Sequence, residues 1–259
     1  MIDHRAPSTV VSRLRAAGCV FAEDEARLLV DATSTTAELT ALVERRVAGE
    51  PLEHLLGWAE FCGLRVAVEP GVFVPRGRTG FLVEQAVALA SSGAAVVDLC
   101  CGSGAVGLAV ASGLPGVELY AADLDPAAVA CARRNLANVG GEVYEGDLFD
   151  ALPSELRARV DVLVANVPYV PSAEIAWMPT EARDHEPRVA LDGGMDGLDV
   201  ARRVIAGAPR WLARGGSLLF ETSAGQAPAA VALVRAGGLV ARVAADDELG
   251  ATVVIGRLG

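Results

Sequence analysis

Aromatic residues are scarce in this chain of 259 residues, at 5% of the sequence, although hydrophobic residues make up 52%. No uninterrupted apolar stretch reaches the roughly 18 residues that a membrane-spanning helix needs. The most apolar region, residues 86–117, is interrupted by Asp98 and by several glycines. The first residues also lack the basic segment and apolar core of a signal peptide. These absences predict a globular protein of the cytoplasm.

Cysteine and histidine are also rare, with five and three residues. The cysteines show no Cys-x-x-Cys spacing, and an odd count without a secretion signal indicates reduced thiols. Three scattered histidines form no metal-binding cluster, so no metal is expected. Basic residues are outnumbered by acidic ones, 22 to 33, which gives a net charge of −11. Because nucleic-acid affinity comes mostly from Lys and Arg that neutralise phosphates, this balance disfavours a nucleic-acid partner.

Three parts of the chain differ in pattern. Residues 1–56 carry helical periodicity without strand-like alternation, which predicts a small N-terminal helical domain. In residues 57–75, apolar residues alternate around Pro70-Gly71, and this predicts a β-hairpin that joins two domains. Residues 76–259 alternate helix and strand, which indicates right-handed crossovers and a mostly parallel sheet. The predicted fold class is therefore α/β, with a Rossmann-like main domain.

The elements expected in that main domain follow from apolar periodicity and from Gly and Pro positions. The expected helices are 81–90, 105–112, 126–138, 199–206 and 227–236. The expected strands are 94–99, 117–122, 142–144, 160–165, 217–220, 239–244 and 252–257.

A glycine turn follows the first of these strands, in the sequence Asp98-Leu99-Cys100-Cys101-Gly102-Ser103-Gly104. Such glycines let the backbone pass close to a ligand, as in dinucleotide sites. Asp123 ends the next strand, where an acidic side chain can bind ribose hydroxyls, whereas Asp125 fits the N-cap of the following helix. The turn alone leaves a nicotinamide dehydrogenase open, because Gly107 supplies the third glycine of that fingerprint.

The tetrapeptide Asn166-Val167-Pro168-Tyr169 follows the predicted strand 160–165. An Asn side-chain oxygen and a neighbouring carbonyl can accept both N–H bonds of an amide or exocyclic amino group, and so aim its nitrogen at a methyl donor. The residue before proline is extended, and an aromatic ring can stack on a planar amide or base. Asn and Pro are also common in ordinary turns. Together with the glycine turn, however, the tetrapeptide indicates methyl transfer from S-adenosylmethionine to a nitrogen.

Further segments resemble the HemK/PrmC-type protein-glutamine methyltransferases, which methylate the Gln of a Gly-Gly-Gln motif in translation release factors. The similar segments are Gly49–Leu52, Gly57–Phe61, Pro70–Arg76, Gly146–Phe149, Glu186–Gly194 and Asp196–Leu198. The resemblance implies a helical bundle, a hairpin and a Rossmann-like methyltransferase domain. It also implies S-adenosyl-L-methionine as cofactor and a protein substrate, a release factor or a related protein, that is methylated on glutamine.

The resemblance also assigns roles by position. It implies cofactor-binding residues at Asp98, Cys100, Cys101, Gly102, Ser103, Gly104, Asp123, Leu124, Asp147, Leu148 and Asn166. It implies catalytic residues at Asn166, Val167, Pro168 and Tyr169.

Three departures from the family pattern indicate a divergent member, and they leave open an acceptor other than a release factor. Val167 stands where the family has proline, so rigidity is lost while the backbone carbonyl is kept. Cys100 and Cys101 replace a glycine and a small polar residue. Gly77-Arg78-Thr79-Gly80 replaces Pro-(Asp/Glu)-Thr-Glu. Two alternatives stay open: a nucleic-acid adenine methyltransferase, because similar clamps hold a flipped base, and a non-catalytic protein that binds S-adenosylmethionine.

Overall fold

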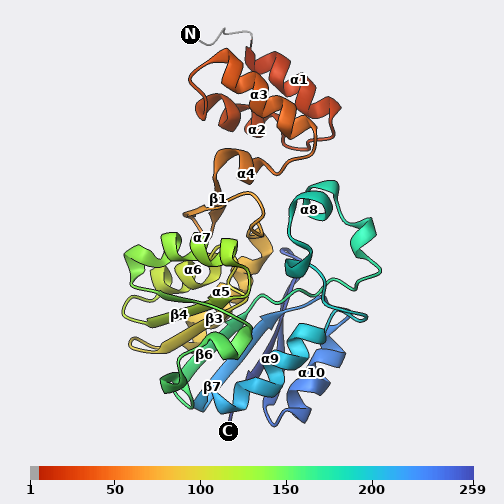
Figure 1. Cartoon of the computed structure of the whole chain (residues 1–259). Helices are drawn as coiled ribbons and strands as arrows, with labels where there is room; N and C mark the ends of the chain where they lie inside the picture. Colours follow the sequence, from red (N-terminus) through yellow and green to blue (C-terminus); the bar gives the residue numbers. More distant parts are fainter. Residues whose placement is uncertain (1–5) are drawn as a thin grey trace.

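The computed structural model of the chain describes residues 6–259, and its first part is a cluster of helices at one end of the molecule (Figure 1). These helices are α1 (Ala6–Ala16), α2 (Ala22–Asp31), α3 (Thr36–Val47) and α4 (Leu52–Leu56). The cluster has a hydrophobic core of its own, made by Val10, Leu14, Ala22, Ala26, Leu29, Leu39 and Val43. The predicted helical pattern is confirmed from Ala6 onward, while residues 1–5 of the predicted domain lie outside the described residues.

The predicted hairpin exists, but its turn is not the predicted one. Strands β1 (Trp58–Phe61) and β2 (Leu64–Ala67) are antiparallel and join through Cys62-Gly63, where both residues have positive φ. A turn does form at Pro70-Gly71, where Val72 N donates to the Glu69 carbonyl oxygen at 3.0 Å. It is not the turn of the hairpin, however, because Val72 and Val74 pack against helix α7 (Pro126–Leu136) instead of pairing as a strand. We retain 1–56, 57–75 and 76–259 as a proposed division of the chain.

A seven-stranded sheet forms the centre of the remaining chain, in the order β5-β4-β3-β6-β7-β9-β8. Its strands are β3 (Ala95–Leu99), β4 (Glu118–Asp123), β5 (Glu142–Glu145), β6 (Val160–Ala165), β7 (Leu212–Glu221), β8 (Val240–Asp246) and β9 (Ala251–Arg257). Strand β9 pairs antiparallel with both of its neighbours, and the pairs among β3 to β7 are parallel. The predicted α/β class and mostly parallel sheet are confirmed.

Helices cover both faces of this sheet (Figure 1). Because side chains alternate along a strand, Val96 and Val162 pack with α5 (Gly80–Leu89), α6 (Ala105–Gly113) and α7. Their neighbours on the other face pack with α9 (Asp199–Gly207) and α10 (Ala227–Ala236). Strand β6 and helix α10 have the predicted bounds, and β7 is longer than predicted because its first half continues past a bulge opposite β6.

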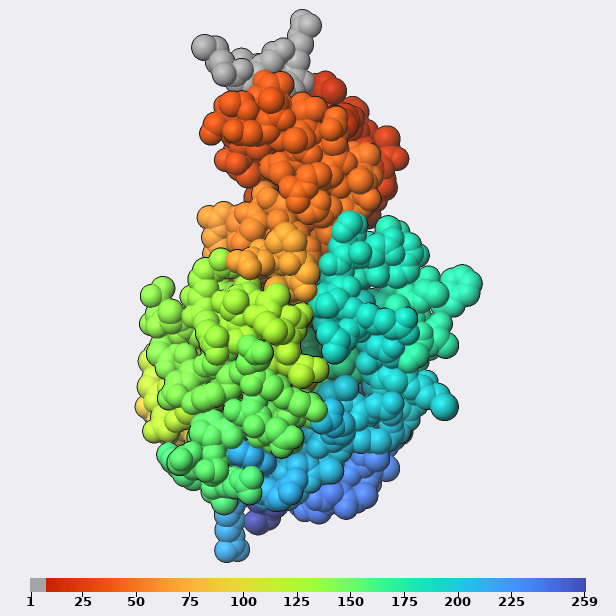
Figure 2. Space-filling view, in the orientation of Figure 1, coloured from red at the N-terminus to blue at the C-terminus, as the bar shows by residue number. Residues whose placement is uncertain are grey.

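A long segment, residues 166–198, connects β6 to α9 and contains the unpredicted helix α8 (Thr180–His185). Figure 2 shows this segment (teal) beside the lower end of the helical cluster. Arg46 of α3 makes the contact, since its guanidinium binds the buried Glu25 at 2.6 Å and Glu181 of α8 at 2.6 Å. In the described part of the chain, no helix is both long and apolar enough to cross a membrane.

Candidate functional site

A cavity of about 240 Å³ opens at the carboxyl ends of β3, β4 and β6. Open α/β sheets bind ligands at the carboxyl ends of their strands, at the point where the strand order changes direction. In this sheet that point is β3, because β4 lies on one side of it and β6 on the other. All but one of the predicted site residues line it: Asp98, Cys100, Cys101, Gly102, Ser103, Asp123, Leu124, Asp147, Leu148, Asn166, Val167, Pro168 and Tyr169. Gly104 is the exception. It is the N-cap of α6, and a Cβ there would lie 3.2 Å from Ala132 and Leu136 of α7.

The glycine turn forms part of the cavity lining. Its residues Cys100, Gly102 and Gly104 have φ of 54°, 55° and 77°. The left-handed conformation suits glycine and costs a residue with a Cβ roughly 1–2 kcal/mol, so Cys100 is strained where the family pattern has glycine. Burial raises the pKa of the Cys100 and Cys101 thiols, which keeps them protonated at neutral pH. They therefore serve as small apolar residues rather than nucleophiles.

Asp123 is placed to bind a polyhydroxyl group. Its Oδ2 accepts a hydrogen bond from Gly102 N at 2.8 Å, and its Oδ1 accepts one from Asp125 N at 2.9 Å. Because each carboxylate oxygen has a second lone pair, both remain able to accept a ribose hydroxyl. Asp125 caps α7, as predicted, by accepting from Ala127 N at 2.9 Å.

Asp98 is a buried carboxyl with one unused oxygen. Its Oδ2 accepts from Gly107 N at 2.9 Å, while Oδ1 has no hydrogen-bond partner among the described residues. Burial, with a smaller effect of nearby Asp123, raises the pKa of Asp98 to about 7. Gly107 thus supports Asp98 and packs on Leu119 instead of completing a dinucleotide fingerprint. A ligand with a cationic group would fit this wall of the cavity.

The loop Asp147-Leu148 forms the next wall and is fixed by α9. Arg203 Nη2 donates to Asp147 Oδ2 at 2.7 Å. Leu148 is buried with φ 51°. Phe149 stacks on Trp211, with 5.7 Å between ring centroids. Sequence reasoning missed Arg203, which also lines the cavity, because only the tertiary fold brings α9 to this loop.

The tetrapeptide, which we call the clamp, forms the wall opposite Asp123. Asn166 is half-buried directly after β6, and Val167 and Pro168 are buried. The Val167 side chain belongs to the same apolar cluster as Leu99 and Leu163. The Pro-to-Val departure therefore retains an apolar contact beneath the clamp.

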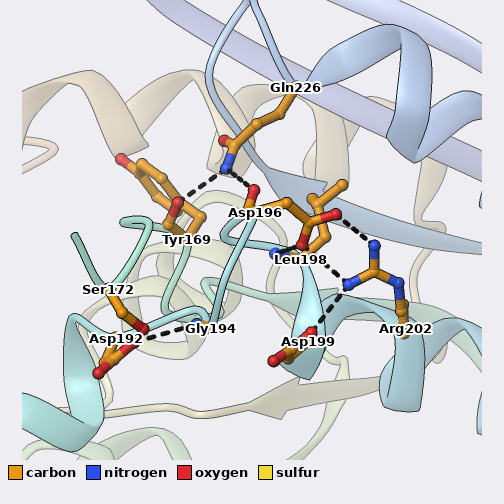
Figure 3. Close-up of polar contacts among 9 residues, drawn as sticks. All are labelled: Tyr169, Ser172, Asp192, Gly194, Asp196, Leu198, Asp199, Arg202 and Gln226. Carbon is orange, nitrogen blue, oxygen red and sulfur yellow. Dashed lines mark hydrogen bonds and ion pairs between the residues drawn. The ribbon is translucent and has the colours of Figure 1, made fainter. Parts of the chain in front are cut away.

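The family-like stretch 186–198 supports the clamp from behind (Figure 3). Gln226 Nε2 donates to the Tyr169 and Asp196 carbonyl oxygens, both at 2.9 Å. Arg202 binds Asp196, and this lowers the pKa of the Asp196 carboxyl to about 2. A Cβ at Gly197 would lie 2.2 Å from both Tyr169 O and Gln226 Nε2. Glycine is required there because the two backbones approach so closely.

The same stretch also closes the cavity on its outer side. Ser172 Oγ and Gly194 N donate to Asp192 Oδ1 at 2.5 and 3.0 Å. Glu186, whose side chain is 1% exposed, accepts from Arg76 at 2.6 Å and from Val74 N at 3.1 Å. The outer wall of the cavity is thereby fastened to the segment that leads from the hairpin into α5.

Comparisons with known proteins identify similar chains. Residues 63–181 match the family model for the methyltransferase small domain. A release factor glutamine methyltransferase of Geobacter sulfurreducens is 40% identical over 221 residues, which cover 84% of this chain and 77% of that protein. One of Bifidobacterium longum is 37% identical over 88% of this chain and 83% of that protein.

Solved structures share the fold. A methyltransferase of Pyrococcus furiosus has a TM-score of 0.58 at 15% identity and covers 76% of this chain and 90% of that one. A 16S rRNA N2 G1207 methyltransferase of T. thermophilus has a TM-score of 0.56 at 21% identity, and the match covers 78% of this chain and 50% of that one. At such identities the likeness concerns the fold alone.

Proposed function

We propose that this chain, which belongs to the release factor glutamine methyltransferase family, methylates the side-chain amide nitrogen of a protein glutamine. Its cofactor is S-adenosyl-L-methionine, which supplies an electrophilic methyl group when bound. The residues present suit that cofactor, because Asp123 offers acceptors for ribose hydroxyls and Asp98 has an unused buried oxygen for a cationic group. The location in the cytoplasm remains a prediction.

The observation that carries the proposal is the position of Asn166 in the same cavity as Asp98 and Asp123. An amide nitrogen is a poor nucleophile, because its lone pair is conjugated with the carbonyl. Asn166 Oδ1 and the Val167 carbonyl would accept its two N–H bonds, and that would fix the nitrogen for attack. The ring of Tyr169, which also lines the cavity, offers a face for the planar amide.

We also propose that the acceptor protein is a release factor, as the names of the relatives state for those proteins. Two of the departures from the family pattern, Cys100 and Val167, lie in supporting positions and leave Asn166 and Pro168 unchanged. The groups that would bind the amide are therefore those of the family.

The test uses S-adenosylmethionine with a labelled methyl group, purified release factor and a release factor whose motif glutamine is changed to alanine. We expect label and a mass gain of one methyl group on the glutamine of the intact factor only. Asn166→Ala should reduce turnover about 100-fold or more, the scale for loss of one pre-organised polar contact in a transition state. Its cofactor affinity should stay within about twofold of the unsubstituted chain.

Asn138→Ala, at an exposed asparagine outside the cavity, is the matched control and should keep full turnover. Full activity of Asn166→Ala would refute the clamp mechanism. Label that is removed by nuclease and resists protease would instead establish the nucleic-acid alternative. Cofactor binding without transfer to any protein would favour the non-catalytic one.

A further inference from the structure

Arg78, one of the departures from the family pattern, contacts the clamp. It lies in the short 3-10 helix η1 (Gly77–Thr79), directly before α5. Its Nη2 donates to the Tyr169 hydroxyl at 2.6 Å, and its Nε donates to Glu221 Oε1 at 3.0 Å. The Tyr169 hydroxyl in turn donates to the same Glu221 oxygen at 2.8 Å. Arg78, Tyr169 and Glu221 are thus each hydrogen-bonded to the other two, although they are distant in sequence.

The buried carboxylate of Glu221 explains why an arginine stands here. Glu221 is the last residue of β7 and its side chain is 3% exposed, whereas that of Arg78 is 47% exposed. A buried carboxylate without a cation is strongly destabilising, and Arg78 is the cation that binds it. The acid that the family pattern has at position 78 would instead repel Glu221.

Tyr169 is bound both at its hydroxyl and at its backbone. Burial and the nearby Glu221 raise the pKa of Tyr169 to about 12, so its hydroxyl stays protonated and can donate. At the other end of the residue, Gln226 binds the Tyr169 carbonyl oxygen. Arg78 and Tyr169 both line the cavity. The hydroxyl and the backbone of Tyr169 are therefore both bound.

We infer that Arg78 is a positioning residue for methyl transfer, and that it acts through Tyr169. With Glu221 it fixes the tyrosine ring as a rigid wall for the acceptor amide, a task that the family pattern does not give to this position. The inference rests on the proposed function, because it assigns Tyr169 to the acceptor side of the cavity. Its alternative is that Arg78 binds the acceptor protein directly.

The kinetic test uses Arg78→Met, Arg78→Lys, Tyr169→Phe and the double variant Arg78→Met/Tyr169→Phe, with acceptor protein and cofactor varied separately. We expect Arg78→Met and Tyr169→Phe each to lower kcat about tenfold while cofactor affinity stays unchanged. Arg78→Lys should recover part of the kcat that Arg78→Met loses. The double variant should be no slower than Tyr169→Phe alone, because both changes release the same ring. Additive losses, or a loss confined to KM for the acceptor, would show direct binding and overturn the inference.

The double variant Arg78→Met/Glu221→Leu distinguishes a positioning role of Arg78 from a purely structural one. It removes the buried carboxylate of Glu221 together with the arginine that binds it. Replacing both members of a buried pair by apolar residues is often neutral for stability. We expect near-normal thermal unfolding with kcat still about tenfold low. A return of kcat to normal in this variant would mean that Arg78 only stabilises the fold.

A readout without turnover keeps this inference distinct from the proposed function. The chain has three tyrosines, so fluorotyrosine labelling gives three fluorine resonances, and Tyr169→Phe identifies that of Tyr169. We expect Arg78→Met to shift or broaden the Tyr169 resonance and to leave those of Tyr120 and Tyr144 unchanged. An unchanged Tyr169 resonance would overturn the inference even if methyl transfer occurs. If Arg78→Met changes the Tyr169 resonance but the unsubstituted protein transfers no methyl group, the proposed function is refuted and the contact between Arg78 and Tyr169 stands.

Discussion

Replacing Asp98 by asparagine should make the ligand-free protein more stable, by an amount that grows with pH. The folded state raises the pKa of this carboxyl by burial, from an ordinary value of 3.8 to about 7. The unfolded chain therefore loses the Asp98 proton first, and folding takes the proton up again. By linkage, the contribution of Asp98 to stability declines as pH rises above 3.8 and becomes constant above about 7.

The magnitude follows from the size of this pKa change. At about 1.4 kcal/mol per pKa unit, a rise from 3.8 to about 7 corresponds to a full cost of about 4 kcal/mol. Part of this cost is already present at pH 5, because the unfolded carboxyl is mostly ionised there. The advantage of Asp98→Asn should therefore widen by about 2–3 kcal/mol between pH 5 and pH 8. The desolvation of the new amide is independent of pH and cancels in this difference.

The assay is urea unfolding of both proteins at several pH values. Asp247→Asn, an isosteric change at an exposed carboxylate in the turn between β8 and β9, is the matched control for the loss of one acid. Binding of S-adenosylhomocysteine should weaken at least tenfold in Asp98→Asn, since the cavity loses the carboxyl group that would ionise to bind the cationic group of the ligand. A stability difference that stays constant from pH 5 to pH 8 would show that Asp98 is ionised in the folded protein, and the reasoning would fail.

Two further changes test the cavity and its support. Asp123→Ala should weaken binding of S-adenosylhomocysteine by roughly 1.5–3 kcal/mol, the scale of hydrogen bonds to a charged group. If calorimetry finds equal affinity, Asp123 does not bind the ribose. Gly197→Ala should lower both the thermal unfolding midpoint and kcat, because its Cβ would displace Tyr169 and Gln226. Gly225→Ala, where the nearest atom is 4.0 Å away, should change neither, and equal effects of the two substitutions would contradict the close approach.

The sequence predicts those parts of the fold that local patterns determine. Strand β6 is an apolar run, interrupted only by Asp161, that ends directly before Asn166. Helix α10 begins beside Pro228, so both elements have clear bounds. The hairpin turn was predicted wrongly because Pro70-Gly71 carries the stronger turn signal. The turn actually used needs Cys62 at φ 51°, a conformation that a residue with a Cβ rarely adopts and that its sequence does not signal.

The sequence predicted the carboxylates of the cofactor site but not the residues that hold Tyr169 of the clamp. Asp98 and Asp123 could be placed because each belongs to a buried parallel strand, and the carboxyl ends of neighbouring strands meet. The partners of Tyr169 could not be placed in this way. Glu221 and Gln226 reach the clamp from the end of β7 and from the residue before α10, and only the packing of the whole sheet brings them there.

The three departures from the family pattern have a common physical character. Cys100 accepts a left-handed conformation at a glycine position, Val167 fills the apolar space under the clamp, and Arg78 neutralises a buried glutamate while it binds Tyr169. None of them alters Asn166 or Pro168. The chain has therefore changed the means by which its clamp is held, while the groups that would bind an amide nitrogen are kept. A substitution that alters only the support of a site should reduce turnover less than the loss of a group that binds the amide. We therefore expect about a tenfold loss for Arg78→Met and about a 100-fold loss for Asn166→Ala.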